Sequence, residues 1–241
     1  MKPSKPWKLA PVVSCEHGGN RVPARHRGVL RGAARALDSH RGWDRGALEL
    51  ARELARALAA PLVASTVTRL LVDANRSLRS PRLFSEWTRG LPREERDGIL
   101  AAWWAPHRTA VEGLVRARAR RRKSVLHLSV HSFTPRWKGR ARTVDVGLLY
   151  DPARRPERAF AARWRAALRE RRPELRLRTN QPYRGIEDGL TTSLRERFDE
   201  RHYLGLELEV SQRFPLGPAA EWRRLRRDLG ETLLAALEEE G

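Results

Sequence analysis

The feature that most constrains the fold is an alternation of two kinds of segment along the chain. Short apolar runs rich in β-branched residues, such as 125–131 (VLHLSVH), are separated by longer stretches with helical spacing of their apolar residues. In 44–59, for example, Leu48, Ala51 and Ala55 fall on one helical face while most charged residues point elsewhere. This alternation is typical of an α/β architecture with a mostly parallel or mixed sheet.

The boundaries of the expected elements follow from the same spacing. Strands are expected at 10–14, 61–65, 69–73, 125–131, 144–150, 175–179 and 203–210. Helices are expected at 44–59, 93–121, 156–171 and 219–239. The chain has 241 residues, enough for one substantial core, and contains no repeat or low-complexity linker, so we expect residues 1–241 to form a single domain.

The net charge of +20 is the most unusual property of the composition. A basic surface gains affinity for polyanions by releasing their counterions. Nearly all of the 49 basic residues are arginines, however, and most are scattered among Ala, Leu, Gly and Pro. The densest run, 116–123 (RARARRRK), carries no base-reading motif. We therefore expect no specific nucleic-acid partner, and a basic polyanion-binding protein is the alternative from a different functional class.

Two further features bear on location. No stretch approaches the roughly 20 consecutive apolar residues of a membrane-spanning helix, and the first apolar run is more typical of a core strand than of a signal peptide. The single cysteine, Cys15, cannot form an internal disulfide bond. These features favour a cytoplasmic protein without a membrane partner, and they leave its oligomeric state unknown.

Histidines stand where expected strands end. His17 follows the first strand and precedes two glycines, which permit a sharp turn and close approach of a metal or substrate. His131 ends the strand 125–131, beyond which an α/β sheet binds its ligands. His127 lies on the same strand face but farther from the end, so a core or supporting position suits it better.

A carboxylate at the start of an expected helix offers a third ligand. Zinc hydrolases use three His, Asp or Glu ligands and leave one position open for water. Asp44 fits this requirement, although an aspartate before a helix is also a common cap. Glu16, Asp38 and His40 are alternatives to Asp44 as the second ligand.

The last expected strand, 203–210 (YLGLELEV), carries leucines on one face and two glutamates, Glu207 and Glu209, on the other. An ordinary half-exposed strand has the same pattern. Two neighbouring carboxylates can also act as a general base and a partner that raises its pKa. Glu209 is the preferred base because it stands nearer the carboxyl end of the strand, and Glu207 then has a supporting role.

Several segments together resemble the successive blocks of the N-formylglutamate amidohydrolase family, in order, over about residues 10–215. They are SCEHGGNRVP (14–23), HRGWDRGALELAREL (40–54), LLVDANRS (70–77), HLSVHSFTP (127–135), DVGLLYDP (145–152), NQPYRGIEDGLTT (180–192) and YLGLELEVSQ (203–212). The family is related to zinc carboxypeptidases. The resemblance therefore implies a three-layer α/β/α fold around a mixed, mostly parallel sheet, with one zinc ion.

The resemblance also implies roles for individual residues. EHGG and VHS are similar to metal-ligand segments of zinc-dependent cell-wall amidases, which implies His17, Asp44 and His131 as ligands. VDANRS resembles the DxNR segment of zinc carboxypeptidases, which implies that Asn75 and Arg76 hold the substrate's carboxylate. Carboxypeptidases have a glutamate three residues after the first histidine, where this chain has Asn20, and this departure leaves the second ligand open.

The implied reaction is the zinc-dependent hydrolysis of N-formyl-L-glutamate to formate and L-glutamate, a reaction of histidine degradation. A small N-acyl amino acid would thus be the substrate, and Arg76, Arg184 and Arg195 are candidates for binding its carboxylate. A related amidase acting on another N-acyl amino acid or on a peptidoglycan fragment is the alternative within the same class.

Overall fold

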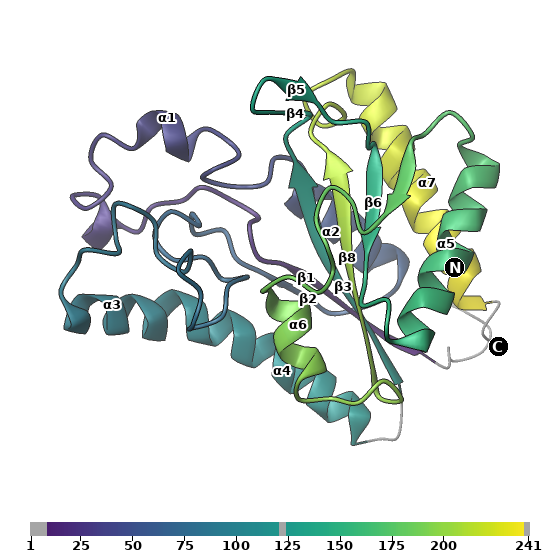
Figure 1. The fold of residues 1–241 in the computed structure, drawn as a ribbon, viewed down its shortest axis with the longest axis horizontal. Coiled ribbons are helices and arrows are strands. Elements are labelled where there is room, and N and C mark those ends of the chain that lie inside the picture. Colours follow the sequence, from purple (N-terminus) through teal and green to yellow (C-terminus); the bar gives the residue numbers. More distant parts are fainter. Residues whose placement is uncertain (1–8, 121–123, 239–241) are drawn as a thin grey trace.

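The computed structural model describes residues 9–120 and 124–238, and its centre is a six-stranded sheet (Figure 1). In spatial order the strands are β2 (Leu62–Ala64), β1 (Leu9–Cys15), β3 (Ser124–Phe133), β8 (Tyr203–Ser211), β6 (Val146–Leu149) and β7 (Leu177–Thr179). All neighbouring pairs are parallel except β6 and β8, which are antiparallel. The expectation of a mixed, mostly parallel sheet is confirmed.

Helices cover both faces of this sheet, because apolar residues alternate along its strands. On one face Leu126 and Leu128 of β3 belong to a core shared with α2 (Ala47–Ala57), α5 (Arg155–Arg171) and α7 (Ala219–Glu238). On the other face Val125 and Tyr203 pack with residues of α4 (Ala105–Ala119) and α6 (Leu190–Arg195). The architecture is therefore three-layered, and the polar ends of β3 and β8 lie on the α4 and α6 face.

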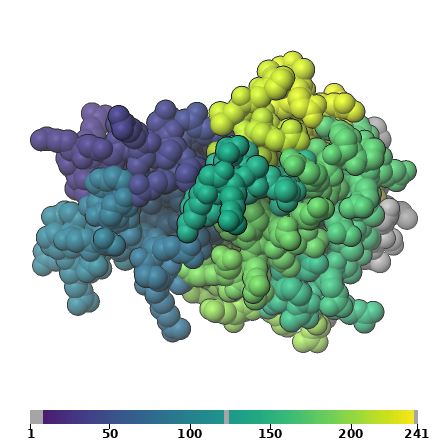
Figure 2. Space-filling model, turned by 45° about the horizontal axis from the view of Figure 1, so that its top comes forward, coloured from purple at the N-terminus to yellow at the C-terminus, as the bar shows by residue number. Residues whose placement is uncertain are grey.

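Residues 16–46 and 65–104 form a second region, here called the loop lobe, at the left of Figure 1. It contains η1 (Ala24–His26), α1 (Ala34–Leu37), α3 (Arg93–Ile99) and the π-helical turn η2 (Leu100–Trp104), joined by irregular chain. Figure 2 shows the lobe in purple and blue beside the body of the sheet, with a small hairpin projecting at the boundary. That hairpin consists of β4 (Arg136–Trp137) and β5 (Arg140–Ala141).

The strand expected at 69–73 is wrong. This segment is a turn in the loop lobe, where the amide of Leu71 donates to the carbonyl of Thr68. Leu71 and Val72 are buried in one small apolar cluster and Leu70 in another. An apolar run can be buried in such clusters without joining a sheet, so apolarity alone did not identify its structure.

The other differences between the expected and the observed elements concern helices and are smaller. The helix expected at 93–121 consists of α3, η2 and α4, while residues 121 and 239, the ends of two expected helices, lie outside the described residues. Helix α6 was not expected, because its residues lie partly in a motif segment taken for a loop. Among the described helices none is both long and apolar enough to cross a membrane.

Candidate active site

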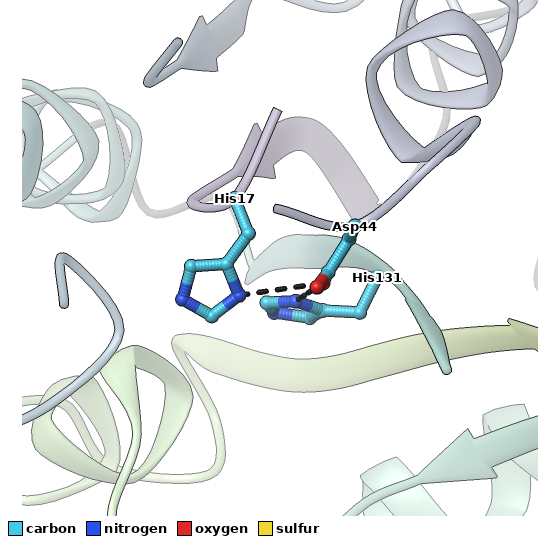
Figure 3. A group of neighbouring side chains, drawn as sticks. All are labelled: His17, Asp44 and His131. Atoms are coloured by element: carbon cyan, nitrogen blue, oxygen red, sulfur yellow. Dashed lines mark hydrogen bonds and ion pairs between the residues drawn. The ribbon is translucent and has the colours of Figure 1, made fainter. Parts of the chain in front are cut away.

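Three buried side chains from separate parts of the sequence meet where β1 and β3 end (Figure 3). His17 follows β1, His131 belongs to β3, and Asp44 comes from the loop lobe just before α2. The Nδ1 atoms of His17 and His131 lie 3.3 and 2.9 Å from the same oxygen, Asp44 Oδ2. One ligand atom from each residue lies within 4.8 Å of the other two, so the group can hold a metal ion.

Asp44 does not cap the helix that follows it. The N-cap of α2 is Gly46, at φ 80°, and no side chain caps this helix. The backbone carbonyl of Asp44 accepts from the amide of Ala47 at 3.1 Å. The carboxylate is therefore free of helix capping and faces the two imidazoles.

The alternatives to Asp44 occupy different positions. Glu16 is buried but lies on the opposite side of His131, with Oε2 3.1 Å from Nε2. The side chain of Asp38 is 77% exposed and pairs with Arg45 at 2.8 Å. His40 lines the cleft with its ring edge-on to Trp137. None of the three faces both Nδ1 atoms, which favours Asp44.

The outer nitrogen of each histidine also contacts a carboxylate. His17 Nε2 lies 2.7 Å from Asp73 Oδ1. His131 Nε2 lies 3.1 Å from Glu16 Oε2 and 2.9 Å from Ser129 Oγ. A carboxylate at Nε2 favours the tautomer with its proton there and leaves the lone pair of Nδ1 for a metal. Both rings are thus oriented with Nδ1 toward the shared oxygen.

The two outer carboxylates are themselves held in place. Arg69 donates to Asp73 Oδ2 from Nε at 3.1 Å and from Nη2 at 2.6 Å. Glu16 contacts His107 Nε2 at 3.2 Å and accepts from Ser129 Oγ at 2.6 Å. Burial alone would raise the pKa of Asp73, but the charges of Arg69 and His17 hold it well below its usual value.

Electrostatics in the site favour bound positive charge. Burial alone would raise the pKa of Glu16, but hydrogen bonds with His107 and His131 hold it well below its usual value. Burial would likewise lower the pKa of His131, but its hydrogen bonds with Asp44 and Glu16 raise it well above the ordinary value. A metal at Nδ1 therefore has to displace a proton, which makes metal binding weaker at low pH.

The two glycines after His17 admit another segment of the chain rather than the metal. A Cβ at Gly18 would lie 2.9 Å from the carbonyl oxygen of Ser65, and one at Gly19 would lie 2.7 Å from that of Thr66. The amide of Gly18 donates to Ser65 at 2.9 Å. The glycines thus let the chain after β2 pack against the turn that carries His17. This packing, and not the expected close approach of a metal, explains why glycine stands at both positions.

The glutamates of β8 lie beside β3 but differ in their surroundings. Glu209 pairs in register with His131, and Glu207 pairs with Ser129. Glu207 Oε1 accepts from Thr191 Oγ1 at 2.5 Å. Glu209 is buried, and its Oε2 has no hydrogen-bond partner within the described residues. Burial raises the pKa of Glu209 to about 8, and this carboxyl group is thus suited to exchanging a proton near neutral pH.

A cleft of about 940 Å³ opens above this group between the loop lobe and the sheet. Glu207, Glu209, Asn75, Arg76 and Arg184 line it. Asn75 Oδ1 accepts from the amide of Leu190 at 2.7 Å, which ties the lobe to α6. Among the described residues, the buried Nε of Arg76 has no hydrogen-bond partner, whereas its Nη1 donates to the carbonyl of Asp188. Arg184 is exposed at the cleft wall.

Arg195 does not line the cleft, so the structure argues against its expected role in binding substrate. Its buried guanidinium lies 3.0 Å from Glu157 and donates to the carbonyl of Gly205 at 2.7 Å and that of Gly185 at 2.5 Å. These contacts join α5, α6 and β8. His127 is also away from the cleft, buried between Ser14 Oγ at 2.8 Å and Tyr203 OH at 2.7 Å.

Two parts of the site were not expected from the sequence. Asp73 stands in the same VDANRS segment as the expected substrate-binding residues, so the motif contained it without revealing its contact with His17. Arg142 and Tyr183 line the cleft beside the hairpin. Nothing in the spacing around Arg142 distinguishes it from the many other arginines of this chain.

Comparisons with known proteins support an amidohydrolase site. The family model described as N-formylglutamate amidohydrolase matches residues 9–214. A gene product of Agrobacterium tumefaciens with a crystal structure is similar at a TM-score of 0.81 and 29% identity, over 97% of this chain and 92% of that one. The crystal structure of an N-formylglutamate amidohydrolase from Ralstonia eutropha JMP134 has a TM-score of 0.70 and 20% identity, over 96% and 93% of the two chains. A search among curated proteins gives no match.

Proposed function

This chain belongs to the N-formylglutamate amidohydrolase family, whose members hydrolyse an amide bond, and we propose that its own reaction is the zinc-dependent conversion of N-formyl-L-glutamate to formate and L-glutamate. The observation that carries the proposal is the convergence of two imidazole Nδ1 atoms on one buried carboxylate oxygen. The unpartnered Oε2 of Glu209 on the neighbouring strand supports it.

The donor set fits one zinc ion. Two imidazoles and a carboxylate are ligands that zinc prefers, and three protein ligands leave a position open for water or substrate. His17, Asp44 and His131 would hold the ion, while Asp73 and Glu16 orient the two rings from behind. When bound, zinc supplies Lewis acidity, which activates water and polarises a carbonyl group.

Glu209 acts as the general base in this proposal. Its carboxylate takes a proton from the attacking water and returns it to the amine nitrogen as the amide bond breaks. The oxygen of water ends in formate, and the nitrogen leaves as the amino group of glutamate. The rise in the pKa of Glu209 caused by burial strengthens it as a base, and a bound dication would moderate that rise.

The loop lobe binds the other end of the substrate. Arg76 offers a guanidinium that can grip a carboxylate with two hydrogen bonds, and Asn75 stands next to it at the cleft wall. Arg184 is exposed at the same cleft and adds positive charge there. Arg195 has no part in this proposal, because protein groups already occupy its donors.

One observation favours a second candidate. The cleft volume of about 940 Å³ is at the upper end of the range for pockets that bind drug-sized ligands, far larger than a formyl amino acid needs. A related amidase acting on an N-acyl amino acid with a larger acyl group would use the same centre.

The experiment is an assay of the purified, zinc-loaded protein against a panel of N-formyl and N-acetyl amino acids, with His131→Ala as control. We expect the highest kcat/KM for N-formyl-L-glutamate, and neither stoichiometric zinc nor turnover in His131→Ala. A preference for longer acyl groups would select the second candidate. Absence of turnover with the whole panel would contradict both.

A further inference from the structure

Arg142 lines the cleft and directly follows the β4–β5 hairpin, which projects between the loop lobe and the sheet in Figure 2. The proposed reaction gives this arginine no role. It nevertheless lines the cleft together with Glu209 and Arg76. Arg142 reaches the cleft from the sheet side, whereas Arg76 reaches it from the loop lobe.

Three aromatic rings hold the guanidinium of Arg142. It lies 5.1 Å from the ring of Tyr183 and 5.4 Å from the rings of Phe133 and Trp137. Its Nη1 also donates to Tyr183 OH at 3.2 Å and to the carbonyl of Thr134 at 3.4 Å. An arginine has five N–H donors. The side chain is therefore fixed in place while donors stay available to a ligand.

Arg142 forms no salt bridge with a carboxylate in the described part of the chain, whereas the cleft arginines Arg69 and Arg41 pair with Asp73 and Glu86. The other cleft arginines without such a partner in the described residues are exposed; these are Arg82, Arg89 and Arg184. Arg142 thus combines partial burial, a fixed position and an unpaired charge, which are the properties of a guanidinium prepared for an anion.

Arg142 shares its cleft with the proposed catalytic base, because Glu209 lines the same cleft. An anionic group bound at Arg142 would therefore lie in the cleft where the proposed reaction takes place.

We propose that Arg142 is a specificity-determining residue that binds a second carboxylate of the substrate, the one on the amino-acid side chain. The inference rests on the proposed function, in which Arg76 binds the α-carboxylate. Two guanidiniums on different walls of one cleft match a dicarboxylate such as an N-acyl glutamate or aspartate. The rings of Trp137 and Tyr183, which flank Arg142, provide apolar surface for the methylene groups between the two charges.

The test compares N-formyl-L-glutamate with N-formyl-L-glutamine, which has the same shape but no side-chain charge. Zinc-loaded wild-type protein should prefer the glutamate by about 10- to 100-fold in kcat/KM, the value of hydrogen bonds to a charged group. Arg142→Gln should reduce that preference to within about threefold by slowing the glutamate reaction alone. Arg142→Lys keeps the charge but loses the planar fork, so its preference should be intermediate.

The matched control is Arg82→Gln, which removes an exposed cleft arginine that has no assigned role and should keep the wild-type preference. Zinc content, measured for every variant, shows that the site has formed. Equal losses on the two substrates in a zinc-replete Arg142→Gln protein would overturn the inference, as would a wild-type protein that turns over both equally well. Failure of the wild type on both substrates would instead contradict the proposed function, and the inference with it.

Discussion

The two halves of the active site are built in different ways. On the strand side, His131 and Glu209 stand near the ends of adjacent parallel strands, and the register of β3 with β8 brings them side by side. His17 follows directly after the end of β1. On the loop side, Asp44 and Asp73 belong to irregular chain outside any strand, and their side chains contact His17 through long-range hydrogen bonds.

This structural difference suggests that the two halves of the site have different chemical roles. Strand ladders fix backbone positions at many points, so groups that exchange protons benefit from standing on them. In our proposal the loop lobe completes the metal site with Asp44 and presents Arg76 to the substrate in the cleft. We therefore assign the proposed proton transfer to the strand side, and the third metal ligand and binding of the α-carboxylate to the loop side.

We expect the largest loss of activity from a substitution on the strand side. Glu209→Gln removes the proposed base without removing a metal ligand, so it should keep zinc and lose about 10² to 10⁴ in kcat. Glu207→Gln is the matched control on the same strand face and should be milder, since Glu207 is bonded to Thr191. Measuring kcat and zinc content decides between them. If the two outcomes are exchanged, Glu207 is the base.

The carboxylates that contact the outer nitrogens of His17 and His131 allow a second comparison of the two halves. Asp73→Asn on the loop side and Glu16→Gln beside the strands each remove the charge behind one ligand histidine, and each should weaken zinc binding by about 10- to 100-fold. Zinc competition with a chelator measures both. Unchanged affinity in either variant would show that the histidine concerned does not depend on its outer carboxylate.

We expect the smallest loss of activity from a substitution of the proposed substrate-binding residue Arg76 in the loop lobe. Arg76→Lys keeps the positive charge but loses the two-pronged grip, so kcat/KM should fall about 10-fold for an N-formyl amino acid. The same substrate with its α-carboxylate converted to an amide should be almost unaffected. Parallel kinetics on the two compounds separate the cases, and equal losses would assign Arg76 a role in chemistry or folding instead.

The sequence predicted the strand side better than the loop side. Strand alternation placed Glu207 and Glu209 on one face, and the structure has them so. The run 69–73 was taken for a strand, because burial in a small cluster and burial in a sheet select the same residues. The contact of Asp73 with His17 is long-range and leaves no local signal.

Two candidate arginines show the same limit of prediction from the sequence. Arg76 stands in a motif segment and Arg195 three residues after one, yet Arg76 lines the cleft and Arg195 is buried against Glu157. Local sequence does not distinguish a guanidinium that meets substrate from one that joins helices, because both need the same fork of donors. Only the packing of α5 and α6 against β8 decides it.

The central claim is that one zinc ion joins the two halves through the Nδ1 atoms of both histidines and the carboxylate of Asp44. Anomalous diffraction from crystals of the zinc-loaded protein, recorded at the zinc edge, tests it most directly. We expect one peak within about 2.0 to 2.2 Å of His17 Nδ1, His131 Nδ1 and an Asp44 oxygen. A peak bound through the Nε2 atoms or through Glu16, or the absence of any peak between His17 and His131, would contradict the account.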